Sequence, residues 1–519
     1  MSFLFEHLLI LTWAWPLLMA LSLACSPIRT HAIRLLPLAL VPGLLLWLAY
    51  VVGVFPPDLS VAWPNVLLGT SLGLNDLSFI WLSLSLAVWF AAAWHSVWVK
   101  DHQAWWFALF FLLSLGGSLG LVLAQDVISF YLSFSLMSIA AWGWVVHEQT
   151  PEAKRAATWY LVLALLGELV LFVGLVARAA ELQTLLLSEW AQAPLTWPLI
   201  WIWLGLAVKV GVPILHVWLP LAHPAAPVPA SAVLSGVMIK AGFIGWWLLM
   251  PSLVMQDVSW LDALAWLGVF TMLFGVVFGL LQTEAKAVLA YSSISQMGWL
   301  IWGLSWVWAS DQPQLGIWWL AAFALHHALV KGALFLGVGW VKYSAPNARW
   351  MPWVWGGLII LALILAGLPL TSGAWIKAEM KASSDGIVPA LMILAASVGT
   401  ALLMIHFLRR LARVEAHAQP LQKAALISWF VLFGLAVIWP YLVAMPSQIF
   451  AGWQSALQPI AIAMVLALAW RIRVHKQWHC PPGDMLLVFE FIGSRIVRFI
   501  RHHQAWWLKQ KRHLKWASF

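Results

Sequence analysis

The sequence has few charged residues. Only 9% of its 519 residues are Asp, Glu, Lys or Arg, whereas 63% are hydrophobic. Soluble domains carry about 25% charged residues, so a soluble globular protein is excluded. Disorder needs low hydrophobicity and high charge, and is excluded as well. The apolar runs exceed the roughly 10 residues of a barrel strand, which excludes a membrane β-barrel. The composition therefore predicts an all-α, polytopic membrane helix bundle.

Cysteine is nearly absent. The two cysteines, Cys25 and Cys480, lie too far apart in sequence for a disulfide framework, a zinc ribbon or an Fe–S cluster motif. No glycine-rich nucleotide-binding fingerprint follows a strand-like run. We therefore expect no cofactor and no metal in this chain, and we interpret it as a transport or coupling subunit rather than an enzyme. The N-terminus lacks the basic region and cleavage site of a signal peptide, so we expect the first apolar run to remain as a span.

About fifteen apolar runs are long enough to cross a bilayer, which takes roughly 20 mostly apolar residues. The first covers residues 7–25, and the last and shortest covers 452–470. Residues 55–75 contain three prolines and are expected to form a loop or hairpin. With the N-terminus outside, twelve Lys and Arg fall in inner loops and two, Arg178 and Lys381, fall in outer loops. This bias predicts a cell inner membrane protein with a cytoplasmic C-terminus.

The net charge of +9 comes almost entirely from residues 471–519, which hold 10 Lys and Arg and 2 Asp and Glu. Within this tail, residues 485–516 place apolar side chains on one helical face and basic side chains on the other. Such a helix lies on an anionic bilayer or docks a soluble protein. We do not expect nucleic acid as a partner, because the basic patch adjoins the membrane.

Several ionisable residues fall inside or at the ends of the predicted spans, where each costs about 2.5–3.5 kcal/mol on insertion scales. They are Glu168, Lys209, Lys240, His326, His327, Lys331, Lys377 and Glu379. A low-dielectric site lowers the pKa of a lysine and a nearby carboxylate raises it again, while histidine titrates near neutral pH. The set therefore indicates a proton relay.

Each of these residues also has a plainer interpretation. A lysine near a span end, such as Lys377, can extend its ammonium group to the interface. His326 or His327 can simply hydrogen-bond to a neighbouring helix. Glu168 can be a packing residue, and Arg178 is the only cation in its span. These alternatives remain open at the level of sequence.

Two predicted spans are interrupted by helix-breaking residues. Gly211 and Pro213 interrupt the seventh span, and Gly367 and Pro369 interrupt the twelfth. Paired breaks in corresponding spans point to inverted repeats with a site near the midplane. We therefore expect N-terminal helices 1–3 in residues 1–100, two inverted five-helix repeats in 101–250 and 251–410, helices 14–15 in 411–470 and the tail in 471–519.

Four sequence segments resemble motifs of the antiporter-like membrane subunits of respiratory complex I, multisubunit Na⁺/H⁺ antiporters and membrane-bound hydrogenases. The segments run from Lys209 to Gly242, from Lys286 to Trp299, from His326 to Gly339 and from Gly367 to Glu379. Residues 74–82 resemble the start of the family's third span. The resemblance implies conduction of protons or Na⁺.

Residue by residue, the resemblance implies specific roles. Lys209 matches the lysine of the broken seventh helix, and Lys240 matches the central lysine of the eighth. His326, His327 and Lys331 match the relay of the eleventh helix. Lys377 matches the exit-side lysine of the broken twelfth helix. His216 and His223 also match the motif but lie near a span end or in a loop.

The chain departs from this family at three positions. Ser135 stands where the family places a fifth-span Glu, Leu221 where an acid is common, and Ser235 where a His is often found. We expect Glu168, one span later, to replace the missing fifth-span carboxylate.

The complex I subunit that this sequence most resembles continues into a long lateral helix, where we expect a cytoplasmic tail here. The shifted carboxylate, this different C-terminal part and the basic tail together resemble the membrane subunit of the DAB-type inorganic carbon accumulation complex. That resemblance implies a large cytoplasmic partner related to β-carbonic anhydrases, which would hold the zinc. The function would be cation conduction coupled to CO₂ or bicarbonate uptake. Two alternatives remain: a pumping subunit of a redox complex or of a multisubunit Na⁺/H⁺ antiporter, and a structural anchor whose relay is inactive.

Overall fold

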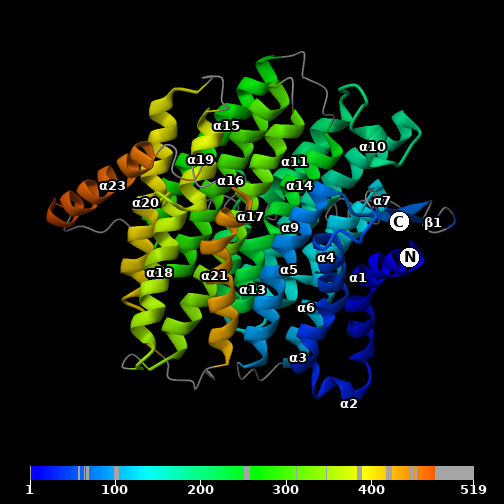
Figure 1. The fold of residues 1–519 in the computed structure, drawn as a ribbon, viewed down its shortest axis with the longest axis horizontal. Coiled ribbons are helices and arrows are strands. Elements are labelled where there is room, and N and C mark those ends of the chain that lie inside the picture. The colour runs from blue at the N-terminus through cyan, green and yellow to red at the C-terminus, as the bar shows by residue number, and fades with distance from the viewer. Residues whose placement is uncertain are drawn as a thin grey trace, which may run out of the picture.

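The computed structural model describes residues 2–56, 59–63, 65, 69–98, 104–250, 258–310, 313–345, 348–382, 388–416, 424–444, 449 and 453–473. Across these residues the chain forms a bundle of mostly parallel and antiparallel upright helices (Figure 1). Within the described residues, eleven helices are long and apolar enough to cross a membrane. Three shorter apolar helices add to them: Pro198–Val210, Met351–Ala366 and Ala456–Ala469. The prediction of a polytopic helical membrane protein is confirmed.

The N-terminal part contains three upright segments. They are built from α1 (Ser2–Ser22), α2 (Ser26–Arg29), α3 (Ala32–Leu35), the 3₁₀ helix η1 (Leu36–Leu40), α4 (Val41–Val51) and α5 (Asp76–Val97). Pro37 and Pro42 lie in and just after η1, so the second span joins two helical pieces through a tighter turn. Asn75 caps α5 by accepting a hydrogen bond from the amide of Ser78 at 2.9 Å.

The first repeat region holds the predicted spans four to eight. Its elements are α6 (Ala104–Leu123), α7 (Val127–Ala140), α8 (Trp142–Val145), α9 (Pro151–Leu182), α10 (Leu187–Trp190), α11 (Pro198–Val210), α12 (Trp218–Ala225), α13 (Val228–Val233), the π-helix η2 (Leu234–Met238) and α14 (Lys240–Leu249). The predicted seventh span is therefore two helices, α11 and α12, as its glycine and proline indicate.

The second repeat region and the C-terminal helices follow the same pattern. Their elements are α15 (Val258–Leu280), α16 (Ala285–Ala309), α17 (Pro313–Tyr343), α18 (Met351–Ala366), α19 (Ser372–Ala382), α20 (Ala390–Leu411), α21 (Ala425–Val443) and α23 (Trp453–Arg473). The predicted twelfth span is broken between α18 and α19. The division into two inverted repeats stays a prediction.

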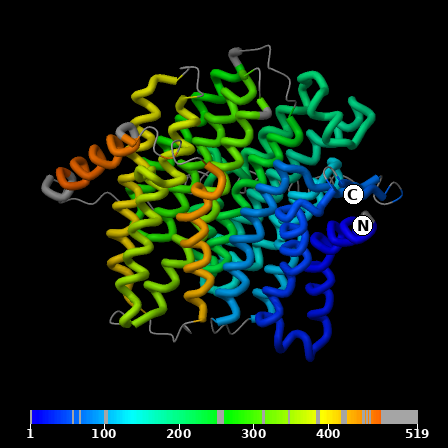
Figure 2. The backbone as a smooth tube through the Cα atoms, in the orientation of Figure 1, coloured from blue at the N-terminus to red at the C-terminus, as the bar shows by residue number. Residues whose placement is uncertain are grey.

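The expected fifteenth span, α23, is a helix but does not stand upright with the others. Figure 2 shows it leaving the side of the bundle, steeply inclined to α20. Its residues Ile460 and Ala463 pack on Ala366, Val398 and Ala401. Nearly all of the predicted basic tail, residues 474–519, lies outside the described residues.

The predicted loop or hairpin at residues 55–75 contains a short antiparallel pair, β1 (Ser60–Trp63) and β2 (Thr70–Gly73), in the register Ser60 opposite Gly73. Asp126, fully buried, attaches this hairpin to α7. Its carboxylate accepts hydrogen bonds from the amide of Ser71 at 2.6 Å and from the amides of Ile128 and Ser129 at 2.9 and 2.8 Å. Asp126 is therefore both a helix cap and a bridge between segments.

Small residues allow the helices to approach closely, as expected where lipid removes the hydrophobic drive between them. A Cβ added at Gly205 of α11 would lie 2.6 Å from the amide nitrogen of Leu171 on α9. A Cβ added at Gly298 of α16 would lie 2.6 Å from the carbonyl oxygen of Gly268 on α15. The α9–α11 contact matters for function, because it fixes the two helices that carry Glu168 and Lys209.

Candidate ion-translocation site

The two broken spans contain the same backbone turn. Between α11 and α12, Gly211 has a φ of 78° and Ile214 a φ of 77°. Between α18 and α19, Gly367 has a φ of 96° and Leu370 a φ of 65°. The turns read Gly-Val-Pro-Ile and Gly-Leu-Pro-Leu. A positive φ at a bulky or β-branched residue is rare, and such conformations cluster at functional sites.

Each break frees backbone carbonyls, and a nearby side chain binds one of them. Trp218 of α12 donates its Nε1–H to the carbonyl of Val208 at 2.7 Å. Lys377 of α19 donates from Nζ to the carbonyl of Leu365 at 2.9 Å. Lys209 and Leu365 both stand two residues before the glycine of their break, so Lys377 binds the position that Lys209 occupies in the other turn.

A cavity of about 20 Å³, the space that one water molecule needs, lies beside the first break. Its lining consists of Phe134, Ser138, Tyr160, Ala164, Gly167, Glu168, Gly205, Val208, Lys209 and Trp218. Glu168 and Lys209 are both buried and interact electrostatically, but make no direct ion pair among the described residues. Oε1 of Glu168 has no hydrogen-bond partner within the described chain.

Glu168 lies next to Ser135, the residue that stands where the family places a carboxylate. Ser135 and Ser138 of α7 lie near the carboxylate of Glu168 on α9, and neither hydroxyl oxygen has a hydrogen-bond partner within the described chain. The carboxylate therefore comes from a different helix but reaches the same place in the bundle. This geometry is consistent with the expected replacement and leaves its role to experiment.

Aromatic rings surround the ammonium group of Lys209. Its Nζ lies 5.3 Å from the ring centroid of Trp218, 5.9 Å from that of Tyr160 and 6.0 Å from that of Phe134. Ring faces attract a cation without removing its proton. They can therefore stabilise a charged lysine in a site that also lets the proton leave.

Lys240, at the start of α14, is bound by the π-helix that precedes it. Its Nζ donates to the carbonyls of Ser235 and Gly236 at 3.1 and 2.6 Å. A π-turn leaves such carbonyls without their usual helical partners and often marks a functional site. The π-helix thus supplies the oxygens that bind this fully buried lysine.

The eleventh span, α17, adds three buried groups. Lys331 donates from Nζ to the carbonyl of Leu289 at 2.7 Å and to the hydroxyl of Ser292. His326 Nδ1 lies 2.8 Å from the hydroxyl of Ser372 at the start of α19. Neither ring nitrogen of His327 has a hydrogen-bond partner among the described residues. His327 interacts electrostatically with Lys240, Lys331, His326 and Lys377.

The structure thus gathers the sequence-predicted residues into two groups. Lys240, His326, His327, Lys331 and Lys377 form one connected basic cluster, hereafter the central cluster. Glu168 and Lys209 form a separate pair. Glu379 joins neither group: it is half-buried and does not line the cavity beside Lys377.

A family model described as "NADH:quinone oxidoreductase/Mrp antiporter, TM" matches residues 124–403, more than half of the chain and both broken spans. The chain belongs to this family. It is an antiporter-like, multi-pass membrane protein of the type found in complex I, hydrogenases and Mrp antiporters. The sequence resemblance is confirmed at this level.

Curated relatives come from several kinds of complex. The chain is 28% identical over 397 residues to NAD(P)H-quinone oxidoreductase chain 4 1 of Synechococcus sp. (strain JA-2-3B'a(2-13)), covering 70% of this chain and 71% of that protein. It is 27% identical over 330 residues to hydrogenase-4 component B of Escherichia coli (strain K12), covering 58% of this chain. The chain spans about half (49%) of the length of that second relative.

Two solved structures share the fold. The Mrp complex from Dietzia sp. DQ12-45-1b matches 95% of this chain and 60% of the compared chain, with a TM-score of 0.74 and 20% identity. The membrane-bound sulfane sulfur reductase, an archaeal respiratory membrane complex, matches 97% of this chain and 94% of the compared chain, with a TM-score of 0.69 and 21% identity.

Lys286 is one of the twelve cations that the charge bias assigns to inner loops, and the structure corrects that placement. Lys286 is buried at the start of α16, and its Nζ donates to the carbonyl of Ala226 at 2.6 Å. Beside it, the fully buried His223 stacks on Phe335 with ring centroids 4.5 Å apart. His223 interacts electrostatically with Lys286 and Lys331, so both residues extend the central cluster.

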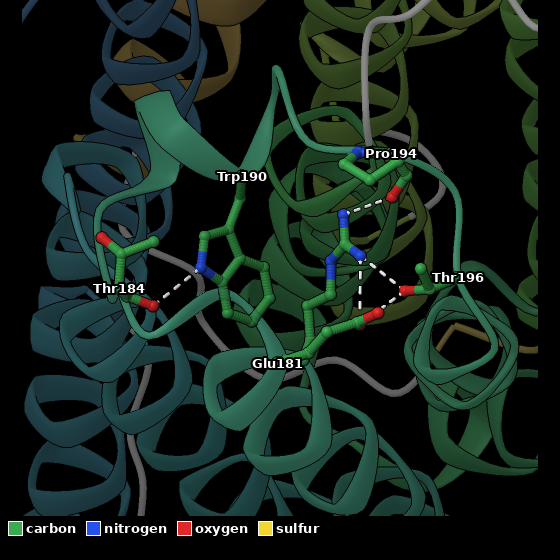
Figure 3. A network of polar contacts seen from close by, with 6 residues as sticks. Glu181, Thr184, Trp190, Pro194 and Thr196 are labelled. Atoms are coloured by element: carbon green, nitrogen blue, oxygen red, sulfur yellow. Dashed lines mark hydrogen bonds and ion pairs between the residues drawn. The ribbon is translucent and has the colours of Figure 1, made fainter.

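Arg178, expected in an outer loop, is also fully buried. Figure 3 shows the network around it: its two terminal guanidinium nitrogens donate to Glu181 at 3.3 Å, to the Thr196 hydroxyl at 2.5 Å and to the Pro194 carbonyl at 2.6 Å. Thr196 in turn donates to Glu181 at 2.6 Å. Arg178 therefore holds the segment after α9 in place and is not the partner of Glu168.

Proposed function

We propose that this chain is the ion-conducting membrane subunit of a multi-subunit complex, and that the ion is the proton. The observation that carries the proposal is the set of buried titratable side chains, which consists of the Glu168–Lys209 pair and the central cluster from Lys240 to Lys377. Buried ionisable residues at membrane depth are costly and mark ion pathways. Ammonium and imidazole groups transfer protons, whereas Na⁺ requires oxygen ligands, so the chemistry favours the proton.

Each part of the pathway has a distinct task. Glu168 and Lys209 form a pair in which a proton can move between a carboxylate and an amine through a cavity that fits one water. Lys240 receives a proton while the π-helix carbonyls stabilise its charge. His327 and Lys331 connect Lys240 to His326, and the Ser372 hydroxyl connects His326 to the twelfth span. Lys377 then carries the proton beyond the second break.

The proposal is tested by proton flux into liposomes that contain the purified complex. The double variant Lys209→Ala/Lys240→Ala removes a proton carrier from the Glu168–Lys209 pair and another from the central cluster, and we expect flux to fall to the level of empty liposomes. Gly356→Ala is a matched control, because no atom lies within 4 Å of the added methyl group. Wild-type flux in the double variant would instead identify the chain as a structural anchor.

We further propose that the proton gradient drives inorganic carbon uptake by a cytoplasmic, zinc-binding partner related to β-carbonic anhydrases. One support is Glu168 on α9, which we expect to replace the fifth-span carboxylate at the position where this chain has Ser135. The other is the basic segment 471–519, which is suited to docking a soluble protein. The corresponding location is the cell inner membrane, with the N-terminus outside. Abolishing the proton gradient with an uncoupler should stop bicarbonate uptake in cells that make both proteins, and unchanged uptake would exclude this coupling.

The alternative is a proton-pumping subunit of a redox complex or of a multisubunit antiporter. It is favoured by relatives whose names are hydrogenase-4 component B and NAD(P)H-quinone oxidoreductase chain 4. Purification of the intact complex separates the two functions. Flavin or Fe–S subunits in the purified complex indicate a redox role, and a large zinc protein without them indicates carbon uptake.

A further inference from the structure

The cavity at the second break contains a lysine that the predicted relay does not include. Lys381, assigned by sequence to an outer loop, lies one helical turn after Lys377 on α19. Residues four apart on a helix share a face. Both lysines line one cavity of about 20 Å³, enough for one water molecule. The position of Lys381 is thus part of the site and not of a loop.

Trp299 of α16 brings the two ammonium groups together. Lys377 Nζ lies 5.3 Å and Lys381 Nζ 5.9 Å from the centroid of the same indole ring. The ring is fully buried, and the two lysines interact electrostatically. The Trp299 ring can stabilise a positive charge on either amine, but two ammonium groups beside the same ring repel each other. The arrangement favours one shared positive charge over two.

Helix α23 lines one side of this cavity. Ala456 and Pro459 of α23 form one wall, and Gly367, Gly373 and Ser397 contribute to the others. Lys381 is half-buried and the next residue, Ala382, is exposed. Lys381 therefore lies between the enclosed Lys377 and the surface at which α19 ends.

We propose that Lys381 is the proton carrier that follows Lys377, and that the proton passes between the two amines inside the cavity walled by α23. The inference rests on the proposed proton conduction. Its chemistry is a simple exchange: the ammonium of Lys377 loses a proton, the neutral amine of Lys381 gains it, and the charge moves one helical turn towards the end of α19.

The test is proton flux in a background in which Cys25→Ser and Cys480→Ser remove the native thiols. Lys381→Arg keeps a positive charge over Trp299, but arginine does not release its proton. We expect Lys381→Arg and Lys381→Cys each to lower flux by at least about tenfold, below the roughly 100-fold that marks the smaller end of the range for a positioned acid or base. Treating Lys381→Cys with 2-bromoethylamine rebuilds a lysine-like amine and should restore flux to within about twofold of wild type.

Lys342 provides a matched control. It lies at the end of α17 with its Nζ 5.3 Å from the ring centroid of Tyr343, outside the cavity. Lys342→Arg and Lys342→Cys should conduct as wild type does. If Lys381→Arg also conducts as wild type does, Lys381 supplies only charge and the inference is wrong. If the wild-type protein itself does not conduct, the proposed function fails, and this result is distinct from the first.

The side on which the cavity opens is tested by thiol labelling. Cys25 is exposed beside α2 at one end of the bundle, whereas α19 lies towards the other end (Figure 1). A membrane-impermeant maleimide should label Lys381→Cys, in the background without native thiols, from the side opposite to the one that labels Cys25 in the single variant Cys480→Ser. Labelling of both thiols from the same side would contradict the direction of transfer.

Discussion

The two broken spans have the same turn but different companions. Beside Gly211, Lys209 shares its cavity with a carboxylate, Glu168. Beside Gly367, Lys377 shares a cavity of similar size with a second lysine, Lys381. The same backbone device thus supports two kinds of site: an acid and an amine, between which a proton can be retained, and two amines, which repel a second positive charge.

This difference indicates the direction in which a proton moves between the two breaks. An opposite charge stabilises a protonated lysine, so the Glu168–Lys209 pair can retain a proton until an event in the complex releases it. A neighbouring lysine does the reverse and favours onward transfer. We therefore interpret the first break as the controlled step and the second as the outlet, and the following experiments test that difference.

Loss of the carboxylate should have the largest effect. Glu168→Gln keeps the shape of the side chain but removes the charge and the exchangeable proton. We expect proton flux to fall about 100-fold, as for loss of a positioned acid–base group. Unchanged yield of the variant in membranes is the control for folding. Full flux in Glu168→Gln would remove the distinction between the two breaks.

Widening the contact between α9 and α11 should be the next largest perturbation. The first added carbon of Gly205→Val would lie 2.6 Å from the Leu171 amide nitrogen and 2.7 Å from the Gly167 carbonyl oxygen, so the helices must separate. Overpacking of this kind costs about 1–3 kcal/mol. Thermal unfolding of the purified protein should therefore occur at a lower temperature, and flux should fall because Glu168 moves away from Lys209. Gly434→Ala, with no atom within 4 Å, should change neither.

Returning the carboxylate to the fifth span should restore part of the activity. In the Glu168→Gln background, Ser135→Glu places an acid on α7, beside the position from which the Glu168 carboxylate has been removed. We expect flux to recover about tenfold relative to Glu168→Gln alone, which is less than the roughly 100-fold of a fully positioned acid because the new carboxylate comes from another helix. The comparison with Ser135→Gln in the same background isolates the charge. No recovery would mean that the pathway requires the acid on α9 itself.

Changing one tryptophan at each break should have the smallest effect. Trp299→Leu eliminates the indole next to Lys377 and Lys381, and a cation–π contact contributes about 0.5–2 kcal/mol. We expect a several-fold decrease in flux. Trp218→Phe at the first break keeps a ring near Lys209 but loses the hydrogen bond to Val208, and should decrease flux less, because Tyr160 and Phe134 remain. The reverse order of effects would contradict our view of the second break.

The helices could be predicted from the sequence because hydropathy and length largely determine which segments cross a bilayer. The broken spans were equally accessible, since glycine and proline interrupt otherwise apolar runs. The inclination of α23 was not, because it depends on packing against α20 and not on composition. A comparison of Gly-Val-Pro-Ile with Gly-Leu-Pro-Leu would have related the two breaks directly.

Within the site, the sequence identified the groups that lie in the middle of apolar runs, such as Lys240 and Lys331. It misplaced charges near span ends: Lys286, Lys381 and Arg178 resemble loop residues, although tertiary packing buries the first and third and draws the second into a cavity. It also included Glu379, which the structure leaves outside both groups. The partners Ser292 and Ser372 come from other helices, so only the fold could reveal them.

The π-helix before Lys240 affects how protons move along the pathway. No carboxylate is among the described groups that interact with Lys240, so carbonyl dipoles at Ser235 and Gly236 act as the counter-charge of this lysine. Dipoles stabilise a cation without accepting its proton, and mutual repulsion limits how many members of the cluster are charged together. A proton that arrives at one end then displaces one that waits further along. Proton transfer along the central cluster is then coupled, because each proton that enters the cluster causes another to leave it.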